Sequence, residues 1–484
     1  MRRTVVSRIF LATLACCAAS SCNRNDTVDT PTPPGFVLVM ADDMGWGQTG
    51  YYNHPVLKTP NLDAMAAAGL RFDRFYAGAP NCSPTRATVL TGRTHDRTGV
   101  EDHGFALRRQ ERTIARALNE VGYATGHFGK WHLNGFRGPG APVLASDNHN
   151  PGVFGFQEWL SVTNFFERDP LMSRNGLFVQ HSGDSSEVVV DEAMRFIGRQ
   201  ARQSRPFLAV LWFGTPHSPW ISSDEDRAAF ADLDRNSQHH YGELVAMDRS
   251  IGTLRAGLRE LGIEASTLVW FTSDNGGLPR IEPGTVGGLR GFKGSLYEGG
   301  IRVPAIIEWP DRIPDPLVSG FPAVTMDIFS TLAAIANIPD EALLQPQDGI
   351  DLLSILDGTE PRREKPIGFR HLGKSALIDN NLKIVSNDRQ TGAYELYDLD
   401  GDPHETNDLA RERPEDLARL SQSLEDWSAS VTDSADGKDY LPGDFDPDEN
   451  LRRSWMTHET YAPYINEWRN RPEFARYIEA AVNN

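Results

Sequence analysis

Short runs of consecutive apolar residues recur along the chain. The clearest are residues 36–41 (FVLVMA), 207–213 (FLAVLWF) and 268–272 (LVWFT), and residues 305–308 (AIIE) form a weaker one. Runs of this length without polar alternation are typical of strands that are buried on both faces. The pattern therefore predicts the inner strands of a sheet that is covered on both sides.

Apolar residues recur at helical spacing between these runs. Residues 113–121 place apolar side chains on one helical face, and residues 242–261 repeat the same spacing over a longer stretch. Strands that alternate with amphipathic helices indicate an α/β fold, in which a large, mostly parallel sheet has helices on both faces. Functional groups in such sheets gather just beyond the carboxyl ends of the strands.

Polar clusters stand directly after the predicted buried strands. They are Asp42-Asp43, Thr215-Pro216-His217 and Ser273-Asp274-Asn275. Because the carboxyl ends of parallel strands share one edge of the sheet, we expect these clusters to converge there. Each acidic cluster alone also fits a simpler role, as a helix cap or a turn. Together Asp42, Asp43, Asp274 and Asn275 offer oxygen ligands that suit Ca²⁺ or Mg²⁺ rather than zinc.

The pattern changes after residue 364. Residues 367–372, 375–380, 381–386 and 394–399 are short apolar segments broken by turn residues, which predicts a small antiparallel meander. An amphipathic helix over 414–428 follows. We therefore divide the folded part into a catalytic domain, residues 35–364, and a smaller α+β C-terminal subdomain, residues 365–484. The last stretch is acidic and then aromatic, and its pattern indicates no role.

The N-terminal residues predict export. Arg2, Arg3 and Arg8 precede a short apolar stretch that cannot span a bilayer, so residues 1–21 are interpreted as a signal peptide. The small residues before Cys22 favour a bacterial lipoprotein site with Cys22 acylated, and ordinary signal-peptidase cleavage is the alternative. Residues 22–34 are polar and contain proline, as flexible tethers do. The expected location is the periplasm, or the outer membrane as an anchored lipoprotein.

Charge limits the choice of partners. The chain of 484 residues has a formal net charge of −18, which should repel nucleic acids and anionic membranes. We therefore expect no nucleic-acid partner. An anionic substrate would need a locally basic pocket.

Cys82 is the one cysteine that the predicted signal and lipidation site leave in the mature chain, since the others are Cys16, Cys17 and Cys22. It cannot form an internal disulfide, so either packing or chemistry must explain it. In the segment CSPTR it stands at the start of a predicted helix, with Pro84 near the first helical position and Arg86 one turn in. Backbone amides at a helix start and a guanidinium group both favour anions.

The longer segment CSPTRATVLTGR resembles the signature of the type I, formylglycine-dependent sulfatases of the alkaline-phosphatase-like superfamily. Further segments match that family in the same order along the chain. They are residues 42–45 (DDMG), 129–132 (GKWH), Pro216-His217, residues 274–276 (DNG) and Lys293 within GFKGSLYEGGIRVP. The late segment ELYDLDGDPHETNDLA is also similar to the C-terminal subdomain of these enzymes.

The resemblance implies a covalent modification and a metal. Cys82 would be oxidised to 3-oxoalanine (formylglycine) by a formylglycine-generating enzyme, and the aldehyde would rest as its hydrate. A sulfated hydrate can expel sulfate by deprotonating its second hydroxyl, whereas a sulfated serine would be a stable ester. The metal would be Ca²⁺, with Mg²⁺ as the alternative. Its expected ligands are Asp42, Asp43, the modified Cys82, Asp274 and Asn275.

The resemblance also implies roles for the basic residues. Arg86, Lys130 and Lys293 would surround the sulfate and its developing charge. His132 would contact the hydroxyls of the formylglycine hydrate. His217, together with Lys293, would protonate the departing alcohol.

These expectations describe a sulfuric ester hydrolase. Because an exported bacterial enzyme meets sulfated polysaccharide, we favour a sulfated saccharide over an aryl sulfate as its substrate, and polysaccharide degradation as its role. His103, Arg168 and Arg174 are loop candidates for sugar subsites, and each also fits an ordinary surface position. The alternatives are a formylglycine-dependent phosphonate monoester or phosphodiester hydrolase, and a non-catalytic protein that binds sulfated glycans.

Overall fold

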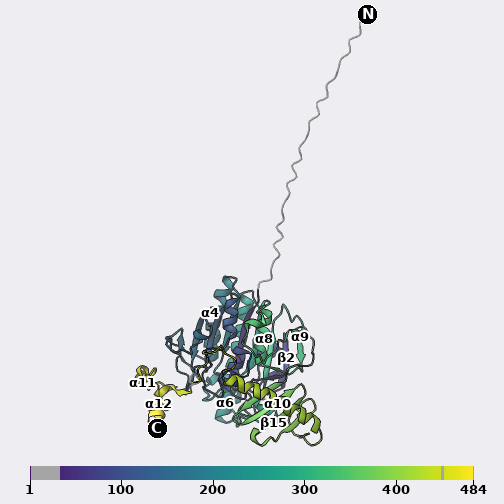
Figure 1. The fold of residues 1–484 in the computed structure, drawn as a ribbon. Coiled ribbons are helices and arrows are strands. Elements are labelled where there is room, and N and C mark those ends of the chain that lie inside the picture. The colour runs from purple at the N-terminus through teal and green to yellow at the C-terminus, as the bar shows by residue number, and fades with distance from the viewer. Residues whose placement is uncertain (2–32, 448–451, 483–484) are drawn as a thin grey trace. The chain divides into compact units, whose positions relative to one another are not determined.

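A large mixed sheet organises the chain (Figure 1). The computed structural model describes Met1 and residues 33–447 and 452–482. Within them the sheet has eleven strands. From one edge to the other these are β11 (Leu317–Ser319), β2 (Leu70–Tyr76), β10 (Arg302–Glu308), β9 (Thr267–Ser273), β1 (Gly35–Ala41), β8 (Phe207–Trp212), β3 (Ala124–Lys130), β5 (Glu158–Val162), β6 (Leu171–Arg174) and β7 (Leu177–Gln180), with β12 (Ala323–Val324) beside β2.

The centre of the sheet is parallel, as predicted. Strands β9, β1, β8, β3 and β5 all run in one direction. The weaker strand candidate lies in β10, which is antiparallel to both β9 and β2. The chain between β9 and β10 stays at the carboxyl edge, where the Gly276 amide donates to the Gly300 carbonyl at 2.9 Å. Because α7 (Glu298–Ile301) then leads directly into β10, that strand must run back across the sheet.

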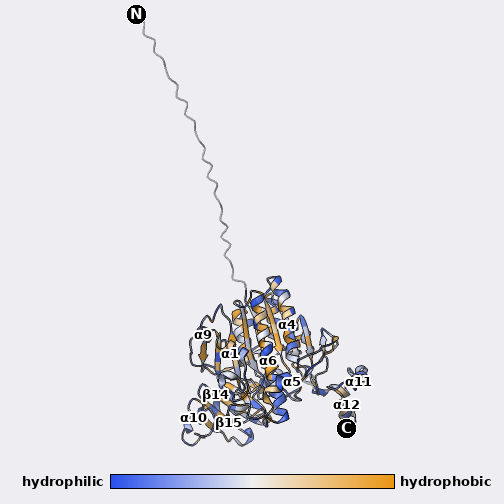
Figure 2. Cartoon of the chain, turned by 180° about the vertical axis from the view of Figure 1, so that it is seen from behind, coloured by the Kyte–Doolittle hydropathy of each residue, from blue (hydrophilic) through white to orange (hydrophobic). Residues whose placement is uncertain are grey.

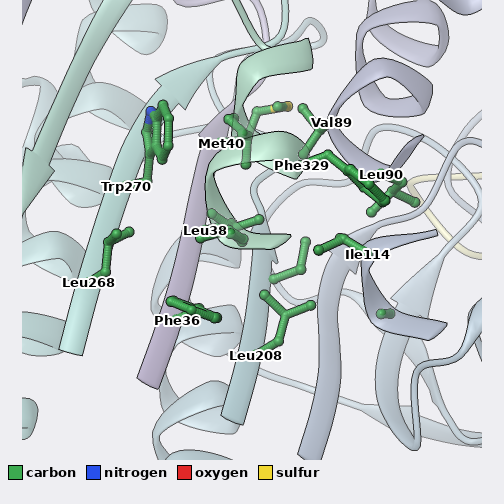
Figure 3. Close-up of a cluster of buried hydrophobic side chains, with 14 of the residues drawn as sticks. Phe36, Leu38, Met40, Val89, Leu90, Ile114, Leu208, Leu268, Trp270 and Phe329 are labelled. Carbon is green, nitrogen blue, oxygen red and sulfur yellow. The ribbon is translucent and has the colours of Figure 1, made fainter. Parts of the chain in front are cut away.

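Side chains of β1 alternate between two apolar cores. Phe36, Leu38 and Met40 point to one face, and Val37 and Val39 point to the other. Figure 3 shows the first core, and Figure 2 shows the apolar strands beside the helices of the second. The first face is covered by α2 (Cys82–Thr91), α3 (Ile114–Glu120) and α8 (Met326–Ile335), and the second by α1 (Pro60–Ala66), α4 (Ser185–Arg202) and α6 (Arg235–Glu260).

Helix α2 is buried along its whole length. Its residues Val89 and Leu90 pack in the same core as Ile114 and Phe329 (Figure 3). The helix begins at Cys82 and ends at Thr91. Gly92 caps it with φ +69°, the left-handed conformation that glycine favours. The predicted helix start at Cys82 is therefore confirmed.

The predicted antiparallel meander is present as a four-stranded sheet. Its strands are β13 (Ile367–His371), β14 (Lys374–Asp379), β15 (Leu382–Ser386) and β16 (Glu395–Asp398), in sequence order. One face packs on α10 (Pro414–Ala435) through Leu420 and Leu424, and this helix is longer than predicted. The other face packs against residues of the large sheet and its loops, such as Tyr76 and Ile301.

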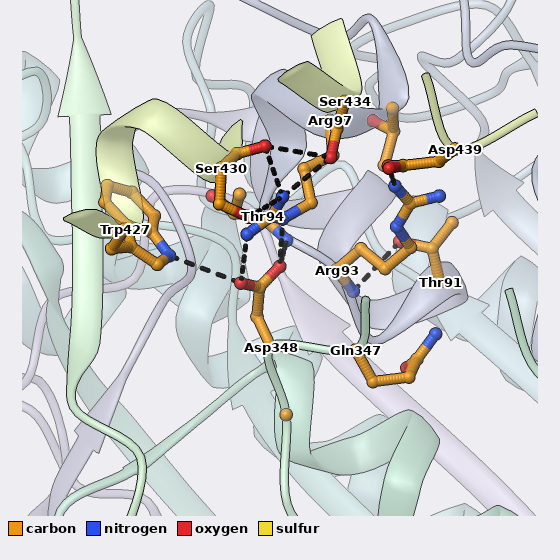
Figure 4. Close-up of polar contacts among 12 residues, drawn as sticks. Thr91, Arg93, Thr94, Arg97, Gln347, Asp348, Trp427, Ser430, Ser434 and Asp439 are labelled. Atoms are coloured by element: carbon orange, nitrogen blue, oxygen red, sulfur yellow. Dashed lines mark hydrogen bonds and ion pairs between the residues drawn. The ribbon is translucent and has the colours of Figure 1, made fainter. Parts of the chain in front are cut away.

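A polar network ties α10 to the turn η2 (His95–Thr98), which follows α2 (Figure 4). The Arg97 guanidinium donates to both oxygens of Asp348, at 2.9 and 3.1 Å. It also donates to Ser430 and Ser434 on α10, and the Trp427 indole donates to Asp348 at 3.2 Å. Helix α10 is thus bound to the segment that directly follows α2, the helix that carries Cys82.

The aromatic C-terminal residues, for which the sequence indicated no role, fold onto the large domain. β17 (Arg453–Ser454) pairs in parallel with β4 (Phe136–Arg137). η8 (Trp455–Thr457), α11 (Ala462–Trp468) and α12 (Ala475–Val482) follow. Their buried side chains form one cluster with the stretch after β4; the cluster includes Phe136, Ala141, Leu144, Trp455, Tyr461, Trp468, Phe474 and Ile478.

Short elements complete the chain. They are α5 (Asp224–Arg227), α9 (Leu353–Leu356) and the 3-10 turns η1 (Gly50–Tyr52), η3 (Pro151–Phe154), η4 (Ala228–Phe230), η5 (Asp340–Ala342) and η6 (Arg389–Thr391). The predicted signal peptide, Cys22 and all but the end of the predicted tether lie outside the described residues. Within the described part of the chain, every helix is too short or too polar to cross a membrane.

Candidate active site

The carboxyl ends of β1, β8 and β9 bring the predicted polar clusters together. The Asp42 amide donates to the Thr215 carbonyl at 2.9 Å, and the Asp274 amide donates to the Ala41 carbonyl at 3.1 Å. The Asp43 amide donates to Asp274 Oδ1 at 3.1 Å. The convergence expected from parallel strand ends is therefore confirmed.

Two residues at this edge take left-handed backbone conformations, which residues other than glycine rarely adopt. Asp43 has φ +74° and His132 has φ +55°. Such conformations persist only where the surrounding structure imposes them, and they are often found at functional sites. Here the Asp43 amide contact to Asp274 and the buried backbone of His132 hold them in place.

Cys82 lies at the centre of the cluster. Its Sγ is 3.4 Å from Asp42 Oδ1, 4.0 Å from Asp43 Oδ1 and 3.4 Å from Lys293 Nζ. The side chain is buried at the amino end of α2. Burial and the Asp274 carboxylate both raise the pKa of the Cys82 thiol, so the protein alone does not stabilise a thiolate here.

The acidic side chains form a compact set of ligands. Asp42, Asp43, Cys82 and Asp274 each offer one atom, and these atoms lie within 4.8 Å of one another. Asn275 Nδ2 donates to Asp43 Oδ1 at 2.8 Å, while Asn275 Oδ1 is buried without a hydrogen-bond partner among the described residues. An orphaned buried oxygen beside three buried carboxylates fits a hard divalent cation. The residues present therefore suit Ca²⁺ or Mg²⁺.

Each carboxylate also contacts a basic side chain. Lys130 Nζ is 2.6 Å from Asp42 Oδ2, and Lys293 Nζ is 2.5 Å from Asp43 Oδ1. Arg86 donates to Asp274 Oδ2 through Nε and Nη2, at 3.1 and 2.6 Å. Arg86 and Lys130 are fully buried, so charge pairing compensates part of their desolvation.

These contacts set the pKa values of the carboxyl groups in opposite directions. Burial alone would raise the pKa of Asp42, but Lys130 holds it below its ordinary value. Asp43 is affected in the same way by Lys293. Burial and the neighbouring Asp42 carboxylate raise the pKa of Asp274 in spite of Arg86. Without a cation, the cluster therefore does not fully stabilise three ionised carboxylates.

A cavity of about 330 Å³ lies above Cys82. His132, His217 and Lys293 line it together with Cys82, as expected of residues that meet a substrate. Arg86 and Lys130 do not line the cavity. The Arg86 guanidinium contacts Asp274 and the Lys130 carbonyl, and the Lys130 ammonium contacts Asp42. The two groups of predicted residues thus meet in one site but occupy different depths.

His132 presents unpaired ring nitrogens to this cavity. Both Nδ1 and Nε2 are buried, and neither has a hydrogen-bond partner among the described residues. Burial and the Lys130 ammonium keep the pKa of His132 well below its usual range, so the ring is neutral. A neutral imidazole with free nitrogens can accept or donate a hydrogen bond at a neighbouring hydroxyl.

His217 is held by two contacts. Its Nδ1 is hydrogen-bonded to the Ser218 carbonyl, and its ring stacks on Phe165 with centroids 5.0 Å apart and planes 7° apart. Because a carbonyl oxygen only accepts, Nδ1 carries a hydrogen, and Nε2 is the atom that can exchange a proton. Nε2 lies 3.8 Å from Asp43 Oδ2. Burial lowers the pKa of His217, although Asp43 opposes this shift.

The mouth of the cavity contains residues that no local pattern marked. They are Asn81, Arg137, Gly138, Asn164 and Phe165. Of the loop candidates for sugar subsites, His103 does line the cavity. Arg174 is instead bound to Glu192 by two contacts of 2.8 Å, and Arg168 is not among the lining residues.

Comparison with known proteins agrees with this geometry. The family model described as Sulfatase matches residues 34–338. N-acetylgalactosamine-6-sulfatase of Canis lupus familiaris is 33% identical over 373 residues, which is 70% of this chain and 69% of that protein. Human arylsulfatase A is 33% identical over 371 residues, covering 68% of each protein.

A solved structure shows the same fold over almost the whole chain. Ps i-CgsB in complex with k-i-k-neocarrahexaose superposes with a TM-score of 0.74 at 24% identity, covering 92% of this chain and 99% of that one. The family match and the two relatives thus agree on the family, and the solved structure agrees on the fold. The chain belongs to the sulfatase family of the alkaline-phosphatase-like superfamily, and it is a sulfuric ester hydrolase.

Proposed function

We propose that this enzyme hydrolyses sulfate monoesters of a sulfated carbohydrate, with a formylglycine made from Cys82 and a bound divalent cation. The observation that carries the proposal is the position of Cys82. Its Sγ lies in the floor of the cavity, 3.4 Å from a carboxylate oxygen of Asp42 and 3.4 Å from the Lys293 ammonium. A reacting group at this point would lie close to both the proposed metal ligands and a cation for the substrate.

The roles proposed for the chain's own residues follow from their contacts. Asp42, Asp43, Asp274 and Asn275, with the modified Cys82, would hold Ca²⁺, or Mg²⁺ as the alternative. The formylglycine hydrate would supply a hydroxyl nucleophile, and the cation would lower the pKa of that hydroxyl.

The remaining polar residues would act on the sulfate and the alcohol. Lys293 would bind the sulfate directly, since it lines the cavity. Arg86 and Lys130, from beneath, would fix the carboxylates and add positive potential. His132 would accept from a hydroxyl of the nucleophile, and His217, after taking up a second ring proton at Nε2, would deliver that proton to the departing alcohol.

A carbohydrate substrate is supported by the cavity mouth and by relatives. His103, Arg137 and Asn164 offer polar groups beside the aromatic ring of Phe165, a combination that suits sugar hydroxyls and anionic substituents. One relative is named for a sulfated amino sugar, and the similar solved structure contains a neocarrahexaose. We propose further that a formylglycine-generating enzyme matures the chain. The N-terminal sequence of the chain also supports the proposal that the sulfatase acts in the periplasm or as an outer-membrane lipoprotein.

The test of the proposed function is side-by-side turnover. Protein produced with the maturation enzyme should hydrolyse at least one member of a panel of sulfated saccharides, with a higher kcat/KM than for matched phosphonate monoesters and phosphodiesters. The Cys82→Ala variant serves as the blank for contaminating activity. Faster turnover of the phosphorus esters would instead favour the phosphonate hydrolase alternative.

The role of His217 can be separated from that of the sulfate-binding cations by the leaving group. A phenol has a pKa of about 10 and water of about 15.7, and a sugar hydroxyl is closer to water. A sugar alkoxide therefore needs a proton as the sulfur–oxygen bond breaks, while an activated aryl oxide hardly does. We expect His217→Ala to lower kcat/KM by roughly 10²- to 10⁴-fold on sugar sulfates and far less on an activated aryl sulfate.

Arg86→Ala is the matched comparison for that experiment. It should slow both substrates to a similar degree, because Arg86 pairs with Asp274, a proposed ligand of the cation that both reactions need. Equal losses on the two substrates for His217→Ala would show that His217 serves sulfate binding. The acid role would then pass to Lys293 or a water.

A further inference from the structure

We propose that the C-terminal segment 452–482 supports the catalytic pocket from behind its lining residues and that it positions His217 through Tyr477 and Phe165. The proposal rests on the proposed function, in which His217 protonates the departing alcohol. The segment lies well beyond residues 34–338, which match the family model. It is therefore not part of the matched domain.

The segment is firmly held on the large domain. The Trp455 indole donates to the Pro139 carbonyl at 2.7 Å, and the Tyr461 hydroxyl donates to the Pro142 carbonyl at 3.1 Å. Trp455, Tyr461 and Trp468 are each at most 1% exposed. Burial of three large aromatic side chains at one contact provides enough apolar area to keep the segment docked.

The loop on which the segment docks also carries part of the pocket. Gly138 lines the cavity, and its carbonyl accepts from Asn164 Nδ2 at 2.9 Å. The Gly140 amide donates to the Phe165 carbonyl at 2.8 Å. Trp455 and Phe165 are therefore linked by two hydrogen bonds through the adjacent residues Pro139 and Gly140.

A second route to Phe165 is direct. The Tyr477 ring of α12 lies 6.0 Å from the Phe165 ring, at an interplanar angle of 58°. Phe165 in turn stacks on His217, 5.0 Å away and nearly parallel. The Phe165 ring is thus held between Tyr477 and the imidazole. Since the Ser218 carbonyl fixes only one edge of His217, this stack determines how the ring plane is oriented and where Nε2 points.

The segment also contacts His103, another residue that lines the pocket. Arg452 Nη2 is 3.0 Å from His103 Nε2, and Arg452 Nη1 is 3.5 Å from Asp102. Asp102 accepts from Asn81 Nδ2 at 2.6 Å, directly before Cys82. Two residues that line the cavity, Phe165 and His103, therefore contact the same C-terminal segment.

The experiment uses point variants of the full chain and two substrates, a sulfated saccharide that the enzyme hydrolyses and an activated aryl sulfate. Tyr477→Ala should lower kcat/KM on the saccharide by roughly 2- to 12-fold, the range that one aromatic pair supports, mainly through kcat. The aryl sulfate should be affected far less. Tyr477→Phe keeps the ring, so its kcat/KM on the saccharide should match that of the wild type.

Two controls separate positioning from general destabilisation. Tyr464→Ala removes an aromatic side chain from the same segment, where it stacks on Trp468 and contacts Phe178 away from the pocket. It should not change the ratio of the two activities. In a His217→Ala background, Tyr477→Ala should have no further effect, because residues that act through one group are not additive.

The proposal is overturned if Tyr477→Ala matches the wild type on both substrates, or if its loss persists in the His217→Ala background. An equal effect of Tyr464→Ala would also overturn it. These outcomes occur with an active wild-type enzyme, so they leave the proposed function intact. A wild-type enzyme that turns over no sulfate ester would overturn both.

Discussion

Replacing Cys82 with alanine should abolish turnover while the protein stays folded. Loss of a catalytic nucleophile costs on the order of 10⁶ in kcat in a well-studied hydrolase. The fold should persist because Val89 and Leu90 carry the apolar packing of α2, while the Cys82 side chain contacts Asp42 and Lys293 in the site. Turnover of a sulfated saccharide and the thermal unfolding midpoint measure the two halves of this expectation.

The same residue gives a direct test of the modification. In protein produced with a formylglycine-generating enzyme, mass spectrometry of the peptide that contains Cys82 should find an aldehyde. Protein produced without that enzyme is the matched control, and its activity should fall in proportion to the aldehyde content. Fully active protein that carries only the unmodified thiol would sink the formylglycine mechanism.

Asp274→Ala should remove the bound cation and destabilise the protein. The change takes away one proposed metal ligand and leaves the Arg86 guanidinium, which is fully buried, without its closest partner. Breaking a buried ion pair costs about 3–5 kcal/mol of the free energy of unfolding. Cation content by elemental analysis and urea unfolding with and without Ca²⁺ measure the two effects.

Asp327→Ala is the matched control for this variant. Asp327 forms a comparable buried pair with Arg363, at 2.7 and 2.8 Å, outside the site. It should lose similar stability and keep its cation. If Asp327→Ala lost the cation as well, loss of metal would only report loosening of the fold. A metal-free wild-type sample with full turnover would rule out a catalytic role for the cation.

The parts of the fold that could be predicted are those with a local signal. The unbroken apolar runs at 36–41 and 207–213 correspond to β1 and β8, because only strands covered on both faces need every side chain to be apolar. The convergence of Asp42 and Asp274 followed from the shared edge of parallel strands. The direction of β10 had no such signal, since an apolar run is the same in either direction.

The pocket mouth could not be predicted for a different reason. Arg137 and Phe165 line the pocket, and Tyr477 of the docked C-terminal segment contacts Phe165 from behind, yet each stands in an unremarkable stretch of sequence. The pairing of Arg86 with Asp274 was also hidden, because family resemblance assigned one to the sulfate and the other to the metal. Contacts between distant segments depend on three-dimensional packing, and no local pattern in the sequence marks them.

The depth of Cys82 has a consequence for the timing of biosynthesis. The side chain is 2% exposed, at the first turn of a helix that is buried throughout. A second enzyme that binds the peptide around this thiol could not reach it in the finished fold. The proposed oxidation therefore has to precede folding, so the two processes compete for the nascent chain. Wherever folding were faster than the proposed oxidation, the product would be folded but inactive protein.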